Sequence, residues 1–480
     1  MRWGAVRVAI AVCALLAGCG GSSSPPSPPA DVAVEASGGN VTQLENARGV
    51  SEGVSGSWRL NLISLPGHLI EGYASAPSVN LGESIRIFVN TSDPSFDLSI
   101  YRIGWYGGQG GRLMLGPVHL PGEVQPPPMQ DPQTGLIECD WQHPYDLQVP
   151  QSWVSGVYLV KLTASSGLQS YVVFVVRDDA RTSRFLFQSS VTTFQAYNDW
   201  GGRSLYVGGA TKVSFNRPYK GWAGTGEFLK FEVNTLRFLE REGADVSYTT
   251  NVDVDADPGQ LLRHKAFLSV GHDEYWTLAE RDGLEAARDS GVNLGFFGSN
   301  TGYWQVRLEP SAVDGAASRT LVGYKEQCAS DPLYVTAPPM ATCRWRDPPL
   351  NRPEAALVGV MYAFSPVATD IVIADCPAAL CAGTTLTTGS ILPGMLGPEA
   401  DAIAPSSPPG ITVVGASPYV DANGKRHVFN TTFYTAPSGS RVFAAGSMYW
   451  NWGLDGYATK GPGNADVQQM TRNVLNMLGR

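Results

Sequence analysis

The chain has 480 residues, which is too long for one hydrophobic core and predicts two or three domains. Hydrophobic residues make up 43% of it and charged residues only 16%, so most of the chain is expected to fold. The formal net charge is −9 and no basic cluster stands out, which argues against nucleic-acid binding. The 54 glycines and 34 prolines predict many turns and much β structure.

The N-terminus has the pattern of an export signal. Arg2 and Arg7 precede an apolar run that is too short to span a membrane as a stable helix. The run ends in LAGC, which resembles the lipobox of bacterial lipoproteins and predicts a signal peptide over residues 1–18 with lipid on Cys19. An ordinary cleaved signal peptide is the alternative. Because Gly20 follows the cysteine, we expect an exported envelope protein at the outer membrane or cell surface, held there through its lipid anchor only.

Two segments of different composition follow. Residues 19–55 are rich in Ser, Pro and Gly and are expected to form a flexible tether. Over residues 56–178, short segments alternate apolar and polar residues and are separated by Gly, Pro, Asn and Ser. This pattern predicts an antiparallel β-sandwich of immunoglobulin-like type.

From residue 182 onward, short apolar runs alternate with helical patterns. The apolar runs lie at residues 184–190, 264–271 and 292–300, and the helical patterns lie at 227–243, 277–291 and 466–479. A long loop is expected over residues 191–226. Strands that alternate with helices predict an α/β domain over residues 182–480, with a doubly wound, mostly parallel sheet of the flavodoxin or glutamine-amidotransferase type.

The cysteines that follow the export signal predict disulfides. In an oxidising compartment, close neighbours in sequence are expected to pair as Cys328–Cys343 and Cys376–Cys381, which leaves Cys139 over. A zinc site is the rival for the second pair, but no matching cysteine pair or nearby histidine supports it.

Polar residues gather where three predicted strands end. Ligands bind outside the carboxyl ends of parallel strands, so these segments should converge on one site. They are Tyr197 with Asn198, the hexapeptide GHDEYW at residues 271–276, and Asn300 with Tyr303 and Trp304.

The chemistry of this predicted site has several alternatives. His272 and Glu274 share a face if the segment is extended, and H-x-E can serve a metal site or an acid–base pair. His272 could instead only hydrogen-bond the turn, and Asn300 could be a turn residue in left-handed geometry. The nearby tyrosines could bind ferric iron, pack in the core or line a sugar site; they are Tyr197, Tyr206, Tyr219, Tyr275 and Tyr303.

Five motifs occur in an order that resembles a known family. QAYNDWGGRSLY, NRPY, GADVSYTTNVDVD, LSVGHDEYWT and GFFGSN together resemble the C-terminal region of the large (beta) subunit of bacterial N,N-dimethylformamidase. The resemblance runs roughly from Tyr101 to the C-terminus and is densest from Phe185 to Leu308. It implies an amidohydrolase with one iron ion, held by two tyrosines and a glutamate.

The resemblance also implies which residues bind the metal. Glu274 matches the glutamate ligand, and Tyr197 is the best match for one tyrosine ligand. Tyr219 of NRPY is preferred for the second, with Tyr206 as its rival. The ion implied is ferric.

Further family residues match in part. His272 and Asn300 match an active-site histidine and asparagine. A further catalytic glutamate of the family has no match, because the segment Gly446–Asp455 lies in the corresponding region but contains no Glu. The family enzyme has a small subunit, so a small-subunit partner and a homo-oligomer are both open.

Two functions from different classes follow. The first is an iron-dependent amidohydrolase that acts on the C–N bond of a small amide. The alternative is a non-catalytic, surface-anchored lipoprotein that binds a glycan or another extracellular polymer, or serves as a scaffold, through a degenerate enzyme domain.

Overall fold

The computed structural model describes residues 38–48, 58–61, 63, 69–457 and 463–480. The predicted signal peptide, the lipidation site Cys19 and the first part of the predicted tether lie outside the described residues. The described residues form one compact unit. In the part of the chain that the structure describes, no helix combines the length and apolar character needed to cross a bilayer.

Part of the predicted tether is helical. Helix α1 (Val41–Ala47) begins at Asn40, whose side chain accepts the N–H of Gln43 while the Gln43 side chain accepts the N–H of Asn40. This reciprocal cap supplies partners for two backbone donors at the start of the helix. The expectation of a flexible tether is therefore wrong for these residues, because the cap and the burial of Glu45 fix them to the fold.

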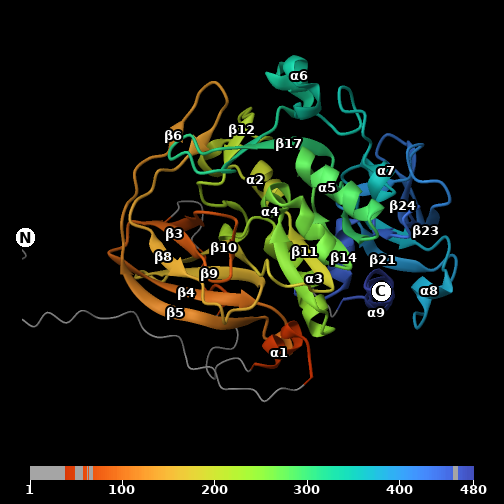
Figure 1. Ribbon diagram of the computed structural model, residues 1–480, viewed down its shortest axis with the longest axis horizontal. Helices are drawn as coiled ribbons and strands as arrows, with labels where there is room; N and C mark the ends of the chain where they lie inside the picture. Colours follow the sequence, from red (N-terminus) through yellow and green to blue (C-terminus); the bar gives the residue numbers. More distant parts are fainter. Residues whose placement is uncertain (1–37, 49–57, 62, 64–68, 458–462) are drawn as a thin grey trace, which may run out of the picture. The chain divides into compact units, whose positions relative to one another are not determined.

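The described chain is mostly β-sheet, divided among several sheets, with helices between them (Figure 1). A three-stranded sheet has the order β1 (Ile70–Ala74), β3 (Ser84–Thr91), β8 (Tyr145–Gln148). A five-stranded sheet has the order β2 (Ser78–Asn80), β10 (Gln169–Arg177), β9 (Gly156–Ala164), β4 (Ser95–Ile103), β5 (Gly111–Pro121). Neighbouring strands are antiparallel, except that β2 runs parallel to β10.

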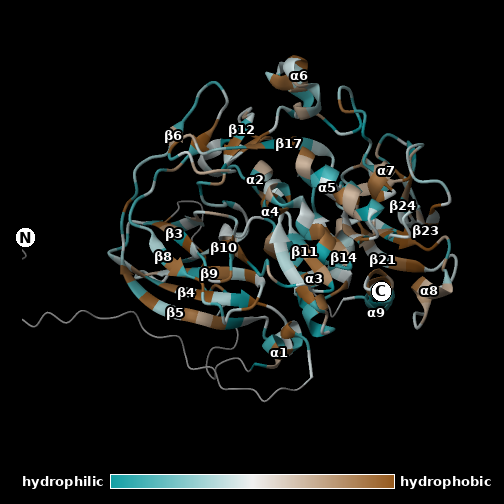
Figure 2. Ribbon diagram, viewed as in Figure 1, coloured by the Kyte–Doolittle hydropathy of each residue, from teal (hydrophilic) through white to brown (hydrophobic). Residues whose placement is uncertain are grey.

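These two sheets share one apolar cluster. Alternate residues of β3, such as Ile85 and Ile87, are buried in the same cluster as Leu98 and Ile100 of β4. Figure 2 shows apolar segments along β4 and β9. The period of two places one face of each strand in the core, as the alternating sequence predicted.

A seven-stranded sheet forms the second large element (Figure 1). Its order is β13 (Val246–Thr250), β11 (Phe185–Ser189), β14 (Ala266–His272), β16 (Asn293–Ser299), β25 (Arg441–Ala444), β24 (Arg426–Thr435), β23 (Thr412–Val420). The first five strands are parallel, and β24 and β23 are antiparallel. Numbered along the chain, the parallel strands run 2-1-3-4-5, so the strand order reverses between β11 and β14.

Helices cover both faces of the parallel strands. Neighbouring residues on each strand enter different apolar clusters; Leu186 and Phe187 on β11 are one such pair. One cluster includes residues of α4 (Asn251–Ala256) and α5 (Leu278–Asp289), and the other includes residues of α3 (Val233–Arg241) and α9 (Ala465–Leu478). Burial on both sides explains why these strands read as continuous apolar runs.

The predicted long loop of residues 191–226 contains structure. Helix α2 (Val191–Tyr197), the short helices η2 (Trp200–Gly202) and η3 (Gly221–Gly224), and strand β12 (Lys212–Ser214) lie within it. Strand β12 pairs with β18, so its partner lies more than a hundred residues away. A pattern within the segment could not reveal that pairing, and the expectation of a loop is wrong here.

Smaller elements complete the described chain. A four-stranded sheet contains β12, β18 (Thr320–Val322), β17 (Trp304–Glu309) and β15 (Tyr275–Thr277). Two-stranded sheets pair β19 (Met361–Phe364) with β22 (Ala400–Ala402), β20 (Thr369–Val372) with β21 (Ile391–Leu396), and β6 (Met129–Gln130) with β7 (Ile137–Glu138). Short helices are α6 (Leu333–Thr336), α7 (Ala355–Val358), α8 (Ala378–Cys381), η1 (Tyr106–Gly108), the π-helix η4 (Phe228–Glu232), η5 (Pro258–Arg263), η6 (Lys325–Ser330), η7 (Pro338–Met340) and η8 (Met448–Gly453).

The structure contains both predicted disulfides. Cys328 is joined to Cys343, and Cys376 is joined to Cys381. Cys139 is buried and free. The first disulfide closes residues 328–343, which contain the end of η6 and all of α6 and η7.

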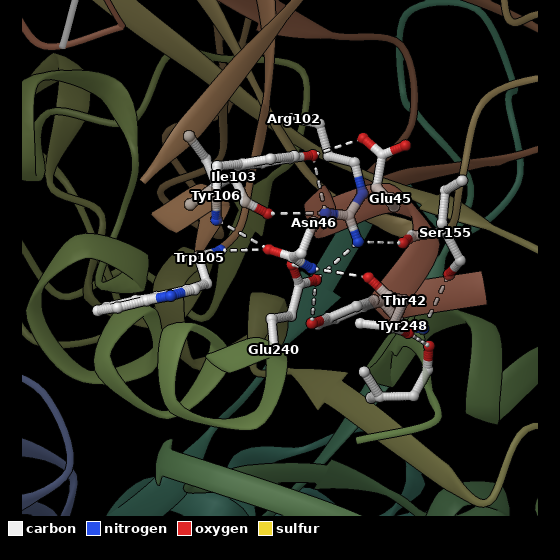
Figure 3. A network of polar contacts seen from close by, with 12 residues as sticks. Thr42, Glu45, Asn46, Arg102, Ile103, Trp105, Tyr106, Ser155, Glu240 and Tyr248 are labelled. Atoms are coloured by element: carbon white, nitrogen blue, oxygen red, sulfur yellow. Dashed lines mark hydrogen bonds and ion pairs between the residues drawn. The ribbon is translucent and has the colours of Figure 1, made fainter. Parts of the chain in front are cut away.

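A buried network of polar contacts links three parts of the fold (Figure 3). Arg102 on β4 forms two hydrogen bonds, of 2.6 and 3.0 Å, with the carboxylate of Glu240 on α3. Tyr248 on β13 donates to the same carboxylate over 2.8 Å. Glu45 on α1 accepts from Tyr106 over 2.6 Å. Both charges of the central ion pair are fully buried, so each depends on the other.

Replacing Arg102 with Met is expected to destabilise the protein by about 3–5 kcal/mol, because it leaves the Glu240 carboxylate buried without its counter-charge. The free energy of unfolding, measured by denaturant titration, tests this. Arg472→Met is the control: its ion pair with Glu242 is partly exposed and should contribute less than about 1 kcal/mol. Equal losses in the two variants would contradict the expectation.

Candidate functional site

The candidate site begins where strands β14 and β16 end side by side. Their parallel register pairs His272 with Ser299, the last residue of each strand. Beyond them the two segments stay together, because the N–H of Tyr303 donates to the carbonyl of Glu274 over 2.8 Å. Glu274 and Asn300 therefore lie at the same edge of the sheet, where ligands bind in such folds.

Two glycines allow the strands to approach this closely. Gly271 has a φ of +72°, and a Cβ atom there would lie 2.7 Å from the Cβ of Phe231. A Cβ on Gly298 would lie 2.2 Å from the carbonyl oxygen of Gly271. Both separations are shorter than side chains tolerate, so the backbone geometry requires glycine at both positions.

The Glu274 carboxylate is the centre of the site. Its Oε2 atom accepts a 2.7 Å hydrogen bond from the phenol of Tyr197 and lies 3.1 Å from Nε2 of His272. Its Oε1 atom accepts a 2.9 Å hydrogen bond from the phenol of Tyr206. The side chain is buried, so these three partners replace the water that a carboxylate would otherwise bind.

The two phenols come from one chain segment. Tyr197 is the last residue of α2, and the N–H of Leu205 donates back to the carbonyl of Ala196, which brings Tyr206 against Tyr197. The two tyrosine rings stack with centroids 4.2 Å apart. Burial and the charge of Glu274 raise the pKa of both phenols, so they are neutral donors unless a cation displaces their protons.

A buried lysine lies against Tyr206. The Nζ atom of Lys325 is 3.1 Å from the centroid of the Tyr206 ring and donates to the carbonyl of Leu205 over 3.2 Å. Burial lowers the pKa of Lys325 to about 8, although the charge of Glu274 acts in the opposite direction. Its φ of 57° is uncommon for a non-glycine residue. The Tyr206 phenol thus contacts both a carboxylate and an ammonium group.

His272 connects Glu274 to a second carboxylate. Its Nδ1 atom lies 2.8 Å from Oε2 of Glu227, and its Nε2 atom faces Glu274. Burial lowers the pKa of His272, but the charge of Glu227 and the hydrogen bonds to both glutamates outweigh burial and raise it well above its ordinary value. Glu227 directly precedes the π-helix η4, a kind of segment that is frequent at functional sites.

Glu399 is a site residue that the sequence analysis missed. Its Oε2 atom lies 3.8 Å from Nε2 of His272 and has no hydrogen-bond partner among the described residues. Burial raises the pKa of Glu399; the charge of His272 opposes this, the charge of Glu274 adds to it, and the pKa stays raised. The nearby side chain of Asn300 also acts against the rise in the pKa of Glu399.

No sequence motif marks Glu399. Its backbone is tied to the end of β16, because the Ser299 hydroxyl donates to its carbonyl over 2.8 Å. An isolated bridge joins Ala400 to Ser447. Glu399 therefore lies beside the segment Gly446–Asp455. That segment corresponds to the family region that carries the further glutamate, but it contains no Glu itself. The pairing is tertiary, and only the order of the sheets reveals it.

Tyr219 lies outside the cluster around Glu274. Its ring packs edge-on against Phe194, with centroids 6.2 Å apart, and it lines a separate cavity with Arg217 and Arg319. The structure therefore brings together Tyr197, His272, Glu274 and Asn300 but not Tyr219. The second phenol in contact with Glu274 is that of Tyr206. Asn300 has a φ of 55°, the left-handed turn conformation considered for it.

Asp273, which lies between His272 and Glu274 in the sequence, points away from this cluster. Its carboxylate accepts hydrogen bonds from Gln188, Asn251 and Ser269, and it is buried. Thr277 caps helix α5. Asp273 thus joins the strand end to its neighbours and does not act as a charge at the helix start.

The phenol oxygens are what could make this a metal site. Among the described residues, no group of three or more His, Cys, Asp and Glu side chains is arranged to hold a metal ion. The donors at Glu274 differ because two of them are phenols. Their oxygens lie 2.7 and 2.9 Å from the carboxylate oxygens, close to the roughly 3 Å between neighbouring oxygens that each lie roughly 2 Å from one ion. A hard cation such as ferric iron fits this donor set.

Replacing Glu227 with Gln is expected to lower the pKa of His272 in metal-free protein. The charge of Glu227 contributes most to holding the buried ring in its protonated form, and the change removes that charge. Nitrogen-15 chemical shifts of the histidine rings, followed across pH in both proteins, measure the effect. His264 is the internal control, because it contacts Ser183 and should titrate alike in both. A neutral His272 ring in the wild-type protein at neutral pH would contradict the assignment.

Of three comparisons with known proteins, one places the chain in a family. The family model described as N,N-dimethylformamidase beta subunit-like, C-terminal, matches residues 97–465, which include all the site residues. The comparison with curated proteins found no match. Among solved structures, a Paenibacillus sp. cycloisomaltooligosaccharide glucanotransferase complexed with cycloisomaltoheptaose is similar at 11% identity, over 52% of this chain and 33% of its own, with a TM-score of 0.15.

The chain spans about a third of that solved structure, and a similarity this low carries no argument about fold or function. The family match is of a different kind, because it covers most of the chain. The protein belongs to the N,N-dimethylformamidase beta subunit-like, C-terminal family.

Proposed function

We propose that the protein is a metal-assisted amidohydrolase that cleaves the C–N bond of a small amide. One observation carries the proposal: two phenols and a carboxylate converge beside a histidine and a second carboxylate, in a member of a family named for an amidase. Oxygen donors next to titratable groups are what metal-assisted hydrolysis requires.

In this proposal the oxygens of Tyr197, Tyr206 and Glu274 hold a ferric ion. Tyr206 takes the place that the resemblance gave to Tyr219, because its phenol contacts Glu274. When bound, such an ion polarises an amide carbonyl and makes a water molecule more acidic. The ammonium group of Lys325 faces the Tyr206 ring and would favour its phenolate form.

The remaining residues manage protons and orientation. Glu399 has a raised pKa and a free oxygen, so it can accept a proton from the attacking water. His272 is held protonated by Glu227 and can donate a proton to the departing nitrogen. The side-chain amide of Asn300 lies near Glu399 and has N–H donors, one of which can donate to the substrate carbonyl oxygen.

The finer architecture is part of the same proposal. We assign the parallel strands to the flavodoxin type because their order is 2-1-3-4-5, and ligands bind at the reversal between β11 and β14 in such sheets. Tyr197 follows β11 and Glu274 follows β14. The two N-terminal sheets are proposed to form an immunoglobulin-like sandwich.

Export and lipid attachment at Cys19 are also proposed. Two disulfides are typical of proteins in oxidising compartments and support export. The substrate would then be a small amide that reaches the cell envelope.

The metal assignment predicts about one iron per chain and a visible tyrosinate charge-transfer band in protein that begins after Cys19. Tyr197→Phe, Tyr206→Phe and Glu274→Ala should each lose most of the iron and the band, because each removes one oxygen donor. Elemental analysis and an absorption spectrum measure both.

Tyr219→Phe is the matched control and should keep iron and band. A band lost in Tyr219→Phe and kept in Tyr206→Phe would overturn the choice of tyrosine. Metal-free wild-type protein that hydrolyses no amide but binds polysaccharide would instead support the polymer-binding alternative.

Glu399→Gln should lower the kcat for small amides by roughly 10²–10⁴-fold, the usual contribution of a general base, with iron content unchanged. Glu309→Gln is the control, since that carboxylate pairs with Lys212 in the four-stranded sheet. Steady-state kinetics with matched iron analysis separates the two roles. Undiminished turnover in Glu399→Gln would remove this residue from the mechanism.

A further inference from the structure

The cavity that Tyr219 lines lies between strands β1 and β10 on one side and helix α2 on the other. We call it the arginine cavity, after Arg217 and Arg319, which line it together with Tyr73, Phe194 and Tyr219. Most of its remaining lining is apolar and includes residues 172–175 of β10. The space that the centre of a water molecule can occupy in it is about 30 Å³. This is room for roughly two waters or one monatomic ion.

Arg217 is buried and bonds only to backbone carbonyls. Its Nη2 atom donates to Asn198 over 2.7 Å, and its Nη1 atom donates to Trp200 and Arg203 over 3.1 and 3.0 Å. Its Nε atom has no hydrogen-bond partner among the described residues. Neutral carbonyls orient the guanidinium but do not neutralise its charge.

Arg319 is in the same situation. Its Nε atom donates to Oδ1 of Asn216 over 2.7 Å, and its Nη2 atom donates to the carbonyls of Ala74 and Phe215. Its Nη1 atom lacks a partner among the described residues. In the part of the chain that the structure describes, neither arginine forms an ion pair; the charges of Glu138 and Asp314 act on Arg319, and that of Asp199 acts on Arg217, without direct contact.

The other titratable side chains that line the cavity are the phenols of Tyr73 and Tyr219. Burial raises the pKa of the Tyr219 phenol, and Arg319 and Arg217 oppose this effect, so the phenol lies near both guanidiniums. Burial also raises the pKa of Tyr73 and of the Cys139 thiol, which lies near Arg217. Burial lowers the pKa of each arginine to about 10, so both remain charged at neutral pH.

Two buried positive charges thus share a small cavity, each with an unused N–H donor and without a carboxylate partner. Burying an unpaired charge is expensive, and proteins usually supply a counter-charge. We propose that the arginine cavity binds one small inorganic anion, with chloride the occupant that its size favours. Arg217, Arg319 and the Tyr219 hydroxyl supply the donors.

The anion would also support the candidate site, although its binding does not depend on the proposed reaction. The three carbonyls that Arg217 holds belong to Asn198, Trp200 and Arg203, which lie between Tyr197 and Tyr206. An anion that fixes the guanidinium therefore fixes the segment that carries both phenols.

Crystals of the protein grown with bromide in place of chloride test the proposal directly. Anomalous density in the arginine cavity is the expected result. Ordered water at that position, with no anomalous signal at high bromide concentration, would overturn it.

Thermal unfolding gives an independent test in solution. In wild-type protein, replacing gluconate with chloride at constant ionic strength should raise Tm by roughly 2 °C in a saturable manner. Arg319→Met and Arg319→Lys should lose this increment, and the control Arg472→Met should keep it. If Arg319→Met does not fold, Arg319→Lys decides. An increment of the same size in the Arg319 variants would overturn the site.

Discussion

The parallel register of strands β14 and β16 is the constraint on which the site depends. It sets His272 opposite Ser299, so the segments after the two strands leave the sheet together. Glycine at positions 271 and 298 permits the approach, since any side chain there would meet backbone or the Phe231 side chain. With the strand ends fixed, Glu274, Asn300 and the backbone of Glu399 have little freedom left, because hydrogen bonds tie each to its neighbour.

Charge organises the groups around that edge. The Glu274 carboxylate accepts from two phenols and faces the His272 ring, which a second carboxylate holds in its protonated form. The Lys325 ammonium, just before the disulfide-closed segment, faces the Tyr206 ring. Carboxylates, an imidazolium and an ammonium thus alternate in a water-poor environment, where each interaction is stronger than in water. Such an arrangement can hold a cation and move protons, and the proposed metal-assisted hydrolysis uses both.

The N-terminal sheets are coupled to this arrangement from two sides. The buried Arg102–Glu240 pair joins β4 to α3, and the arginine cavity lies between β10 and α2. Helix α2 ends at Tyr197, so packing against β10 bears on the position of that phenol. These sheets therefore help to fix the site geometry even though no site residue lies on them. The buried charges of Arg102 and Glu240 therefore have a structural role, although neither takes part in the proposed chemistry.

The sequence by itself determined the local elements and one end of the site. Period-two segments became strands that place alternate residues in one apolar cluster, and the apolar runs at residues 185–189, 266–272 and 293–299 became parallel strands buried on both faces. The two disulfides followed from close spacing. GHDEYW and GFFGSN indicated His272, Glu274 and Asn300, because polar residues directly after buried strands have few structural reasons to be there.

Only the tertiary structure decided the partners that come from elsewhere in the chain. Tyr206 and Tyr219 lie in one segment, and no sequence pattern distinguishes them. The hydrogen bond from Leu205 to Ala196 brings Tyr206, and not Tyr219, against Glu274. Glu399 is placed by the bridge between Ala400 and Ser447, and Lys325 comes from the start of η6, just before a disulfide-closed segment. None of these contacts has a local signal. Their distances depend on how sheets and loops pack, which is set by long-range burial and pairing and not by spacing along the chain.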